Sequence, residues 1–336
     1  HFKKAGLIEK IDRQYQNKIG VCYRCKNPIE PLPLTQFYIE VEPLVQPVLK
    51  ALDAGEVEVY GSGHKKILRH WLDILEDWNI SRQIAWGIRV PVWYNTNQHP
   101  DIQVSYIDNQ GNQVSGPISE LLESASLKEI KQGLQTLNAP VDAKYTISQT
   151  APGDSFLQET DTFDTWFSSS QWPVVTLKNT QPGDFDRFYP TDVMETAYDI
   201  LMFWVMRMLL MGKFMTGKLP FSKVYLHGLI RDEKGQKMSK SKGNVVNPLQ
   251  ITEKYGTDAL RMALMIRSSA GLDKSIGRPD FKAARNLTNK IWNAARFILM
   301  NVDASDLNKQ TTLPEDERFK ANLSSVVEEV TRQLDD

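Results

Sequence analysis

Residues 237–244 have the sequence Lys-Met-Ser-Lys-Ser-Lys-Gly-Asn, and this basic stretch decides how the rest of the chain is interpreted. It follows a strand-like segment at 224–227 and a glycine-containing turn at 232–236, and it precedes Asn247 and Pro248, which favour the start of a helix. Such a loop can close over a polyphosphate, because ammonium groups neutralise charge while hydroxyls and backbone N–H groups donate hydrogen bonds. A solvated charged loop is the usual alternative for a Lys/Ser run.

The composition is that of an ordinary globular chain. It has 336 residues, of which 41% are apolar and 24% are charged, and this length suggests roughly two domains. The net charge of −1 gives no general attraction to nucleic acid, so any RNA contact has to come from local patches. The most apolar run, residues 200–211, is too short to span a bilayer, so we expect a buried helix and no membrane association.

The cysteines, Cys22 and Cys25, are too few for a disulfide framework. Their number fits a reducing compartment, so we expect a cytoplasmic protein. Their spacing could form half of a zinc ribbon, but tetrahedral zinc needs four ligands and the sequence has no second pair. We expect a plain turn here, no metal site and no zinc.

Hydrophobic patterning in the second half predicts a strand, a helix and a second strand. The strand-like segment 191–195 is followed by the apolar run 200–211 and then by the strand 224–227. This order is typical of a parallel sheet in an α/β fold. Ligands of such sheets bind beyond the carboxyl ends of the strands, where residues 196–199 lie.

Other segments are assigned by the same periodicity. Residues 99–155 are polar, with a hairpin signal at 109–112, and indicate a surface insertion. Trp86 stands beside Gly87, and the glycine would let a ligand approach the backbone closely. Helices are expected at residues 2–11, 67–78, 248–255 with Gly256 at the end, 258–268 with Thr257 as the cap, 281–301 and 315–334.

Several separate segments resemble the valyl-tRNA synthetases, a family of class I aminoacyl-tRNA synthetases. Lys242 follows the Lys-Met-Ser-Lys-Ser signature, where isoleucyl enzymes usually have Leu, and Asp199-Ile200-Leu201 replaces their Asp-Gln-His; both features favour the valyl family. The matching segments, in this order along nearly the whole chain, are 77–83 (Asp-Trp-Asn-Ile-Ser-Arg-Gln), 164–169 (Asp-Thr-Trp-Phe-Ser-Ser), 199–204, 237–244, 257–261 (Thr-Asp-Ala-Leu-Arg) and 289–294 (Asn-Lys-Ile-Trp-Asn-Ala).

The resemblance implies a Rossmann-like catalytic domain that is split by an editing insertion. None of the five histidines forms the other class I signature, His-x-Gly-His. We therefore expect a fragment: the second half of a Rossmann-like parallel-sheet catalytic domain, followed by a partial α-helical bundle. Its expected parts are 1–63, a connection after the editing insertion with a lone CxxC; 64–245, the catalytic half with the surface insertion 99–155; 246–277, a stem-contact segment; and 278–336, the start of the anticodon-binding bundle.

The resemblance also implies a chemistry. ATP with Mg²⁺ activates valine to valyl-adenylate, and the valyl group is transferred to tRNA(Val). Positioning and electrostatics would supply most of the catalysis. By position, Lys237 and Lys240 are the catalytic lysines, which bind the ATP phosphates and stabilise the departing pyrophosphate. The ATP-binding residues implied are Lys237, Ser239, Lys240, Ser241, Asp199, Ala197 and His227, and the amino-acid-binding residues are Trp86, Trp166 and Ile200.

Some readings stay open at this point. Asp199 is implied to hold the ribose, although it could instead cap the following helix. Three positions depart from the family pattern, Ala85, Ile88 and Ala197, and the methyl group of Ala197 could crowd the nucleotide. An isoleucyl-type ligase and a non-catalytic tRNA-binding fragment are the alternatives. The complete enzyme is expected to be a monomer, and this chain alone is expected to be inactive.

Overall fold

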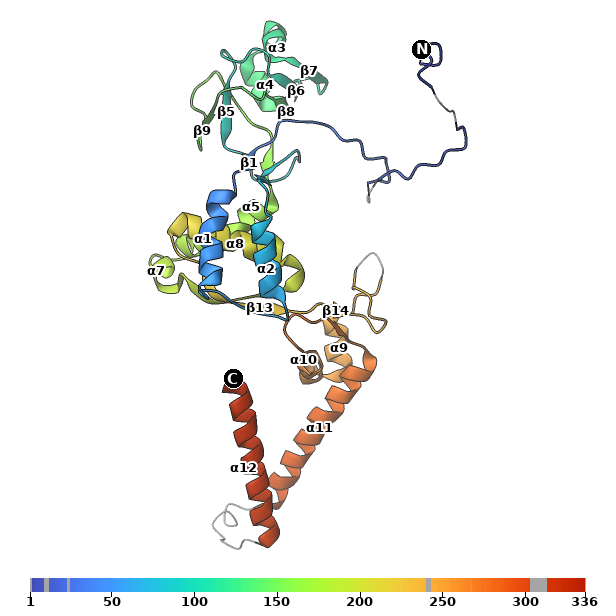
Figure 1. The fold of residues 1–336 in the computed structure, drawn as a ribbon, viewed down its shortest axis with the longest axis vertical. Helices are drawn as coiled ribbons and strands as arrows, with labels where there is room; N and C mark the ends of the chain where they lie inside the picture. Colours follow the sequence, from blue (N-terminus) through green and yellow to red (C-terminus); the bar gives the residue numbers. More distant parts are fainter. Residues whose placement is uncertain are drawn as a thin grey trace. The chain divides into compact units, whose positions relative to one another are not determined.

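The computed structural model describes residues 2–8, 12–22, 25–239, 243–266, 268–302 and 313–335 (Figure 1). The chain forms two compact units whose segments alternate along the sequence. Unit 1 comprises residues 1–57, 68–192 and 202–222, and unit 2 comprises residues 58–67, 193–201 and 223–336.

A three-stranded sheet in the order β12-β13-β2 forms the α/β part of the fold. β13 (Phe221–His227) and β2 (Glu58–Tyr60) are parallel, with Val224 opposite Val59. From β12 (Thr191–Ala197) the chain reaches β13 through a 3-10 turn η1 (Tyr198–Ile200), a π-helical segment η2 (Leu201–Val205) and helix α8 (Met206–Thr216). The expected α/β fold and its strand–helix–strand order are confirmed. A π-helical segment is rare and is often found at functional sites.

Helix α8 lies in the core of unit 1. It packs against α1 (Glu42–Asp53), α5 (Thr165–Ser170) and α6 (Trp172–Asn179). Met208 and Leu209 are fully buried, which confirms the buried helix expected for the apolar run. Across the described residues, no helix is long and apolar enough to cross a membrane. Helix α7 (Asp184–Phe188) packs against α6, and helix α2 (His64–Asp73) begins in unit 2 and continues into unit 1.

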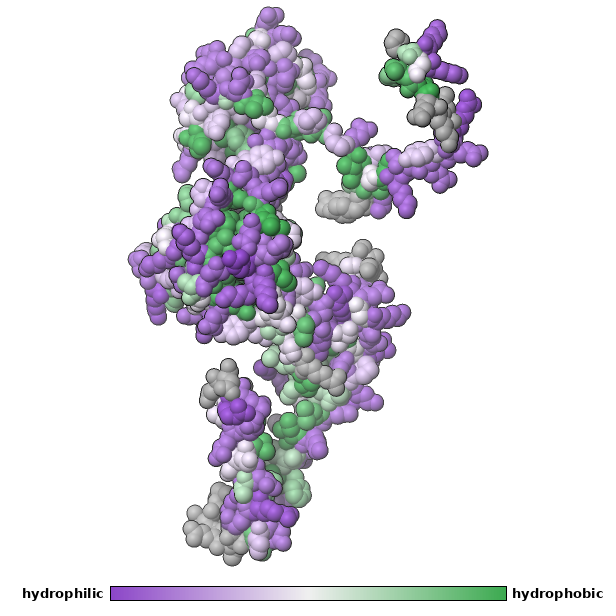
Figure 2. All heavy atoms as spheres, in the orientation of Figure 1, coloured by the Kyte–Doolittle hydropathy of each residue, from purple (hydrophilic) through white to green (hydrophobic). Residues whose placement is uncertain are grey.

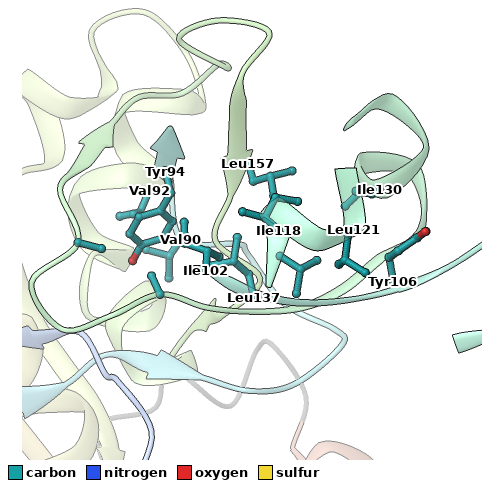
Figure 3. Close-up of a cluster of buried hydrophobic side chains, with 13 residues drawn as sticks. Val90, Val92, Tyr94, Ile102, Tyr106, Ile118, Leu121, Ile130, Leu137 and Leu157 are labelled. Atoms are coloured by element: carbon teal, nitrogen blue, oxygen red, sulfur yellow. The ribbon is translucent and has the colours of Figure 1, made fainter. Parts of the chain in front are cut away.

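Residues 90–157 carry a hydrophobic core of their own (Figure 3). Ile102, Ile118, Ile130 and Leu157 are fully buried in this core, so the polar stretch 99–155 is a packed subdomain and more than a surface loop. The predicted hairpin is confirmed, with its turn at 108–112. The elements are β5 (Val92–Asn95), β9 (Tyr145–Ile147) and β10 (Phe156–Gln158) in one sheet, β6 (Gln103–Ile107), β7 (Gln113–Pro117) and β8 (Leu134–Asn138) in another, and helices α3 (Ile118–Ser124) and α4 (Leu127–Gly133).

Short strand pairs connect distant parts of each unit. The pairs are β1 (Tyr38–Ile39) with β3 (Trp78–Asn79), β4 (Ser81–Arg82) with β11 (Thr162–Phe163), and β14 (Ile230–Arg231) with β15 (Lys274–Ser275).

The rest of unit 2 is helical, and its helix boundaries follow local sequence signals. Helix α9 (Pro248–Tyr255) is capped by Asn247, whose Oδ1 accepts a hydrogen bond from the Leu249 N–H at 3.0 Å, and it ends at Gly256 with φ +94°. Thr257 is the first residue of α10 (Thr257–Met265), so its predicted role as a cap is wrong: Gly256 occupies that position. Two long helices, α11 (Arg278–Asn301) and α12 (Pro314–Asp335), follow.

The helix expected at residues 2–11 is absent from the part that is described, where residues 2–6 form turns; residues 9–11 lie outside the described residues. These side chains are exposed, and an isolated helix of this length is unstable in water because its nucleation is costly. The turn predicted around the cysteines is present, since the Lys26 N–H donates to the Cys22 carbonyl at 2.9 Å.

Candidate active site

Asp199 and Lys237 lie together at the carboxyl end of the sheet in unit 2. Asp199 follows β12, and its Oδ2 is 3.3 Å from the Nζ of Lys237 in the basic loop. Neither η1 nor α8 has a side-chain cap, so Asp199 caps neither of them, and its carboxylate pairs with the loop. The two side chains are 62% (Lys237) and 34% (Asp199) exposed. Exposed pairs of this kind contribute about 0.2–1 kcal/mol, so a ligand that binds either group can separate them.

Two other predicted nucleotide-binding residues end the neighbouring strands. Ala197 is the last residue of β12, and His227 is the last residue of β13. The His227 Nε2 is 3.4 Å from Glu195 Oε1, and its Nδ1 is 2.9 Å from the Gly228 carbonyl oxygen. Because a carbonyl oxygen can only accept, the Nδ1–H of His227 donates this hydrogen bond. All of these side chains therefore lie where ligands of parallel sheets bind.

The basic loop is attached to unit 2 at several points. Met238 packs against a small core formed by Ala259, Ala263 and Phe281 together with their neighbours, and the Ser239 N–H donates to the Asn244 side chain at 2.9 Å. The predicted residues Lys240 and Ser241, and also Lys242, lie outside the described residues.

A network beside Asp199 was not predicted from the sequence. Asp273 accepts hydrogen bonds from the Leu229 N–H at 2.8 Å and from the Arg231 guanidinium. Burial opposes ionisation of Asp273, but these bonds and one from Tyr198 keep the pKa of its carboxyl group below its usual value. The network fixes Tyr198, the residue before Asp199. Asp273 belongs to no motif that the sequence analysis identified, so the sequence did not predict its role.

His64 packs against the ring of Tyr198. Its ring is 8% exposed, and the two ring centroids are 5.4 Å apart. Gly61 and Gly271 make room for the imidazole, since a Cβ on either residue would lie within 2.9 Å of a His64 ring atom. Gly61 and Gly271 therefore serve the packing of His64.

In unit 1, the buried carboxylate of Asp164 holds three segments together. Its Oδ2 accepts a hydrogen bond from Trp78 Nε1 at 3.0 Å, and it is 3.1 Å from Arg207 Nη1 and 3.2 Å from Arg82 Nη2. The Arg207 guanidinium also lies over the Trp78 ring, 3.8 Å from its centroid, and burial lowers the pKa of Arg207. Asp164 is also the N-cap of α5, where its Oδ1 accepts from the Trp166 N–H.

The predicted amino-acid-binding residues have different surroundings. Trp166 stacks on Phe203 in unit 1, with ring centroids 5.8 Å apart. Trp86 is 92% exposed, also in unit 1, and Ile200 is half-buried in unit 2. The close neighbour of Gly87 is the chain itself, since a Cβ there would lie 2.8 Å from the Thr162 Cβ. Thr162 therefore occupies the space beside the Gly87 Cα, and the role of Trp86 in binding a ligand stays a prediction.

Within the described ranges, no three His, Cys, Asp or Glu side chains are grouped as metal ligands would be. The absence of zinc remains a prediction, and Cys22 and Cys25 form no disulfide.

The sequence profile of the tRNA synthetases of class I (I, L, M and V) matches residues 9–277. The chain belongs to this family. It is 40% identical to a valine–tRNA ligase of Dehalococcoides mccartyi (strain CBDB1) over 337 aligned residues, which cover 99% of this chain and 34% of that protein. A valine–tRNA ligase of Thermus thermophilus is 36% identical over 335 residues, which cover 98% of this chain and 35% of that protein.

The fold is also shared with solved structures. A methionyl-tRNA synthetase of Mycobacterium tuberculosis in complex with methionyl-adenylate matches with a TM-score of 0.61 and 18% identity, covering 94% of this chain and 51% of that chain. At this identity the match shows the fold alone. The chain spans about a third of the length of the two valine–tRNA ligases that it matches.

Proposed function

We propose that a protein containing this chain is a valine–tRNA ligase, which activates valine with ATP and transfers it to tRNA(Val). The observation that carries the proposal is the 40% identity to a valine–tRNA ligase over 99% of the chain. The local geometry agrees with it, because a cation and a carboxylate meet at the carboxyl edge of the sheet.

Asp199 and Lys237 would act on different parts of the nucleotide. The Asp199 carboxylate can accept hydrogen bonds from ribose hydroxyls, and the Lys237 ammonium can neutralise phosphate charge. In our proposal ATP separates the 3.3 Å pair, and Lys237 stabilises the charge that develops as the valine carboxylate displaces pyrophosphate. Lys240, Ser239 and Ser241 would complete the phosphate site, with Ala197 and His227 beside the nucleoside.

Mg²⁺ is expected as the partner of the ATP phosphates. The described residues contain no group of three His, Cys, Asp or Glu side chains for a metal, so we assign no protein ligand and no catalytic step to it. Valine would bind near Trp166, Trp86 and Ile200.

The proposed organisation follows the resemblance. Residues 1–63 would be the connection, 64–245 the catalytic half with its insertion, and 246–277 the stem-contact segment. Residues 278–336 would begin the anticodon-binding bundle. Helix α11 exposes apolar side chains, among them Ile291 (57%) and Trp292 (71%), as expected of a helix that packs against further helices of a longer protein (Figure 2). The complete enzyme is proposed to be a cytoplasmic monomer.

Amino-acid-dependent ATP–pyrophosphate exchange by the full-length protein tests the proposal. We expect exchange with valine, followed by charging of tRNA(Val). Exchange with isoleucine in preference to valine would establish the isoleucyl-type alternative. Binding of tRNA without exchange of any amino acid would establish the non-catalytic alternative.

A further inference from the structure

Two turns in this chain share one hydrogen-bonding design. In the hairpin turn of the insertion, Asp108 Oδ1 accepts from the N–H groups of Gln110 at 2.9 Å and Asn112 at 2.8 Å. The Asp108 N–H donates to the Asn112 carbonyl at 2.9 Å, and Gly111 supplies the positive φ of +85°.

The turn that precedes the basic loop repeats this arrangement. Asp232 Oδ1 accepts from the N–H groups of Lys234 at 3.0 Å and Gln236 at 2.8 Å. The Asp232 N–H donates to the Gln236 carbonyl at 3.0 Å, and Gly235 has φ +75°. In both turns the aspartate at the first position therefore fixes the backbone of the residues that follow it.

The turns differ in what their second carboxylate oxygen does. In the insertion, Asp108 Oδ2 accepts from the side chain of Asn112 within the same turn, at 3.2 Å. In the basic loop, Asp232 Oδ2 accepts from Asn244 Nδ2 at 2.9 Å. The same amide-to-carboxylate hydrogen bond thus closes the hairpin turn at Asp108 and, at Asp232, attaches the end of the basic loop at Asn244.

Asn244 uses its remaining groups on the loop itself. Its Oδ1 accepts from the Ser239 N–H at 2.9 Å, and its Nδ2 lies 3.3 Å from the Lys237 carbonyl oxygen. The hydrogen bond from Asn244 is the largest cause that holds the pKa of Asp232 below its usual value, so the carboxylate stays ionised and accepting at neutral pH.

We infer that Asp232 and Asn244 form a clip that positions Lys237 for its contact with the ATP phosphates. The inference rests on the proposed function. Neither side chain needs to touch the nucleotide: both act through the backbone of Lys237 and Ser239. Such positioning matters because a displacement of about 1 Å in a reacting group can cost about 100-fold in rate.

In the clip Asn244 donates and Asp232 accepts, so exchanging the two side chains tests the interaction. Asn244→Asp replaces the donor by a second carboxylate at the 2.9 Å contact, where two acceptors repel. The double variant Asp232→Asn/Asn244→Asp reverses the pair. The amide at position 232 then donates to the carboxylate at position 244, which still accepts from the Ser239 N–H. The 3.3 Å contact to the Lys237 carbonyl then joins two acceptors, so recovery should be large and incomplete.

Asn112→Asp is the matched control, since it makes the same carboxylate pair with Asp108 in the insertion hairpin. ATP–pyrophosphate exchange by the full-length protein gives kcat and KM. We expect Asn244→Asp to lower kcat about 100-fold with an unchanged KM for valine. The double variant should recover most of kcat, and Asn112→Asp should behave as the wild type.

Hydrogen–deuterium exchange at the Ser239 amide supplies a readout that does not depend on activity. It should be faster in Asn244→Asp and return toward wild-type protection in the double variant. Unchanged amide protection, unchanged kcat in Asn244→Asp or a double variant as impaired as the single one would overturn the inference. An equal loss in Asn112→Asp would also overturn it. If none of the amino acids supported pyrophosphate exchange by the wild-type protein, the proposed function would be refuted. Protection of the Ser239 amide would still show whether the clip forms.

Discussion

Replacing Lys237 by alanine should separate catalysis from folding. The Lys237–Asp199 contact is 3.3 Å long, and the lysine side chain is 62% exposed. Such a pair contributes less than about 1 kcal/mol, so Lys237→Ala should leave the free energy of unfolding of the full-length protein nearly unchanged. The removal of a preorganised group that stabilises developing charge typically costs about 2.7–4 kcal/mol, or 10²–10³ in kcat.

Pyrophosphate exchange at varied ATP and valine concentrations measures the catalytic part, and urea denaturation measures stability. We expect kcat to fall by about 10²–10³ while the KM for valine stays constant, since the lost interaction forms mainly in the transition state. Asp199→Asn breaks the same ion pair but retains the lysine, and it should chiefly raise the KM for ATP.

Lys234→Ala is the matched control, because it removes an equal charge from the neighbouring turn. Its effect should stay below about 3-fold, as expected for an exposed charge that is screened by salt. The reasoning is refuted if Lys234→Ala is as harmful as Lys237→Ala. It is also refuted if Lys237→Ala weakens valine binding as much as it slows activation.

Further predictions concern stability, metal content and completeness. Asp164→Ala should destabilise unit 1 by about 3–5 kcal/mol, because it leaves the largely buried Arg207 without its carboxylate partner; tryptophan fluorescence in urea measures the unfolding, and a loss under about 1 kcal/mol would contradict the prediction. Purified protein should contain no stoichiometric zinc by elemental analysis, and one tightly bound zinc per chain would show that the Cys22–Cys25 turn has ligands beyond those described. Residues 1–336 alone should show no valine-dependent pyrophosphate exchange, since only one of the two family signatures is present; robust exchange by this chain would mean that it holds a complete site.

Structural features that depend on residues adjacent in the sequence were predicted well. The start of α9 at Asn247 and its end at Gly256 followed from the sequence, because capping is set by the backbone angles and side chains of a few adjacent residues. The strand, helix and strand of the sheet followed from hydrophobic patterning. The family resemblance placed Asp199 and Lys237 in one site, and the structure shows them in contact within unit 2.

The core at residues 90–157 was missed because β7, β8 and β9 expose many of their side chains, which makes the stretch appear polar. In the described part of the helix expected at 2–11, residues 2–8 are exposed and not helical. A short amphipathic segment whose side chains are exposed does not recover the conformational entropy that a helix costs. In both cases tertiary packing decided the outcome.

The sequence by itself determined most of the local elements, the position of the basic loop and the family. Only the tertiary structure decided which polar groups meet. Trp78 and Asp164 are separated by 86 positions, and Arg231 and Asp273 by 42, yet each pair forms a hydrogen bond. Asn244 likewise gives no sign in the sequence that its partner is Asp232. A hydrogen bond requires two atoms within about 3 Å, and for residues far apart in the chain only the completed fold sets that distance.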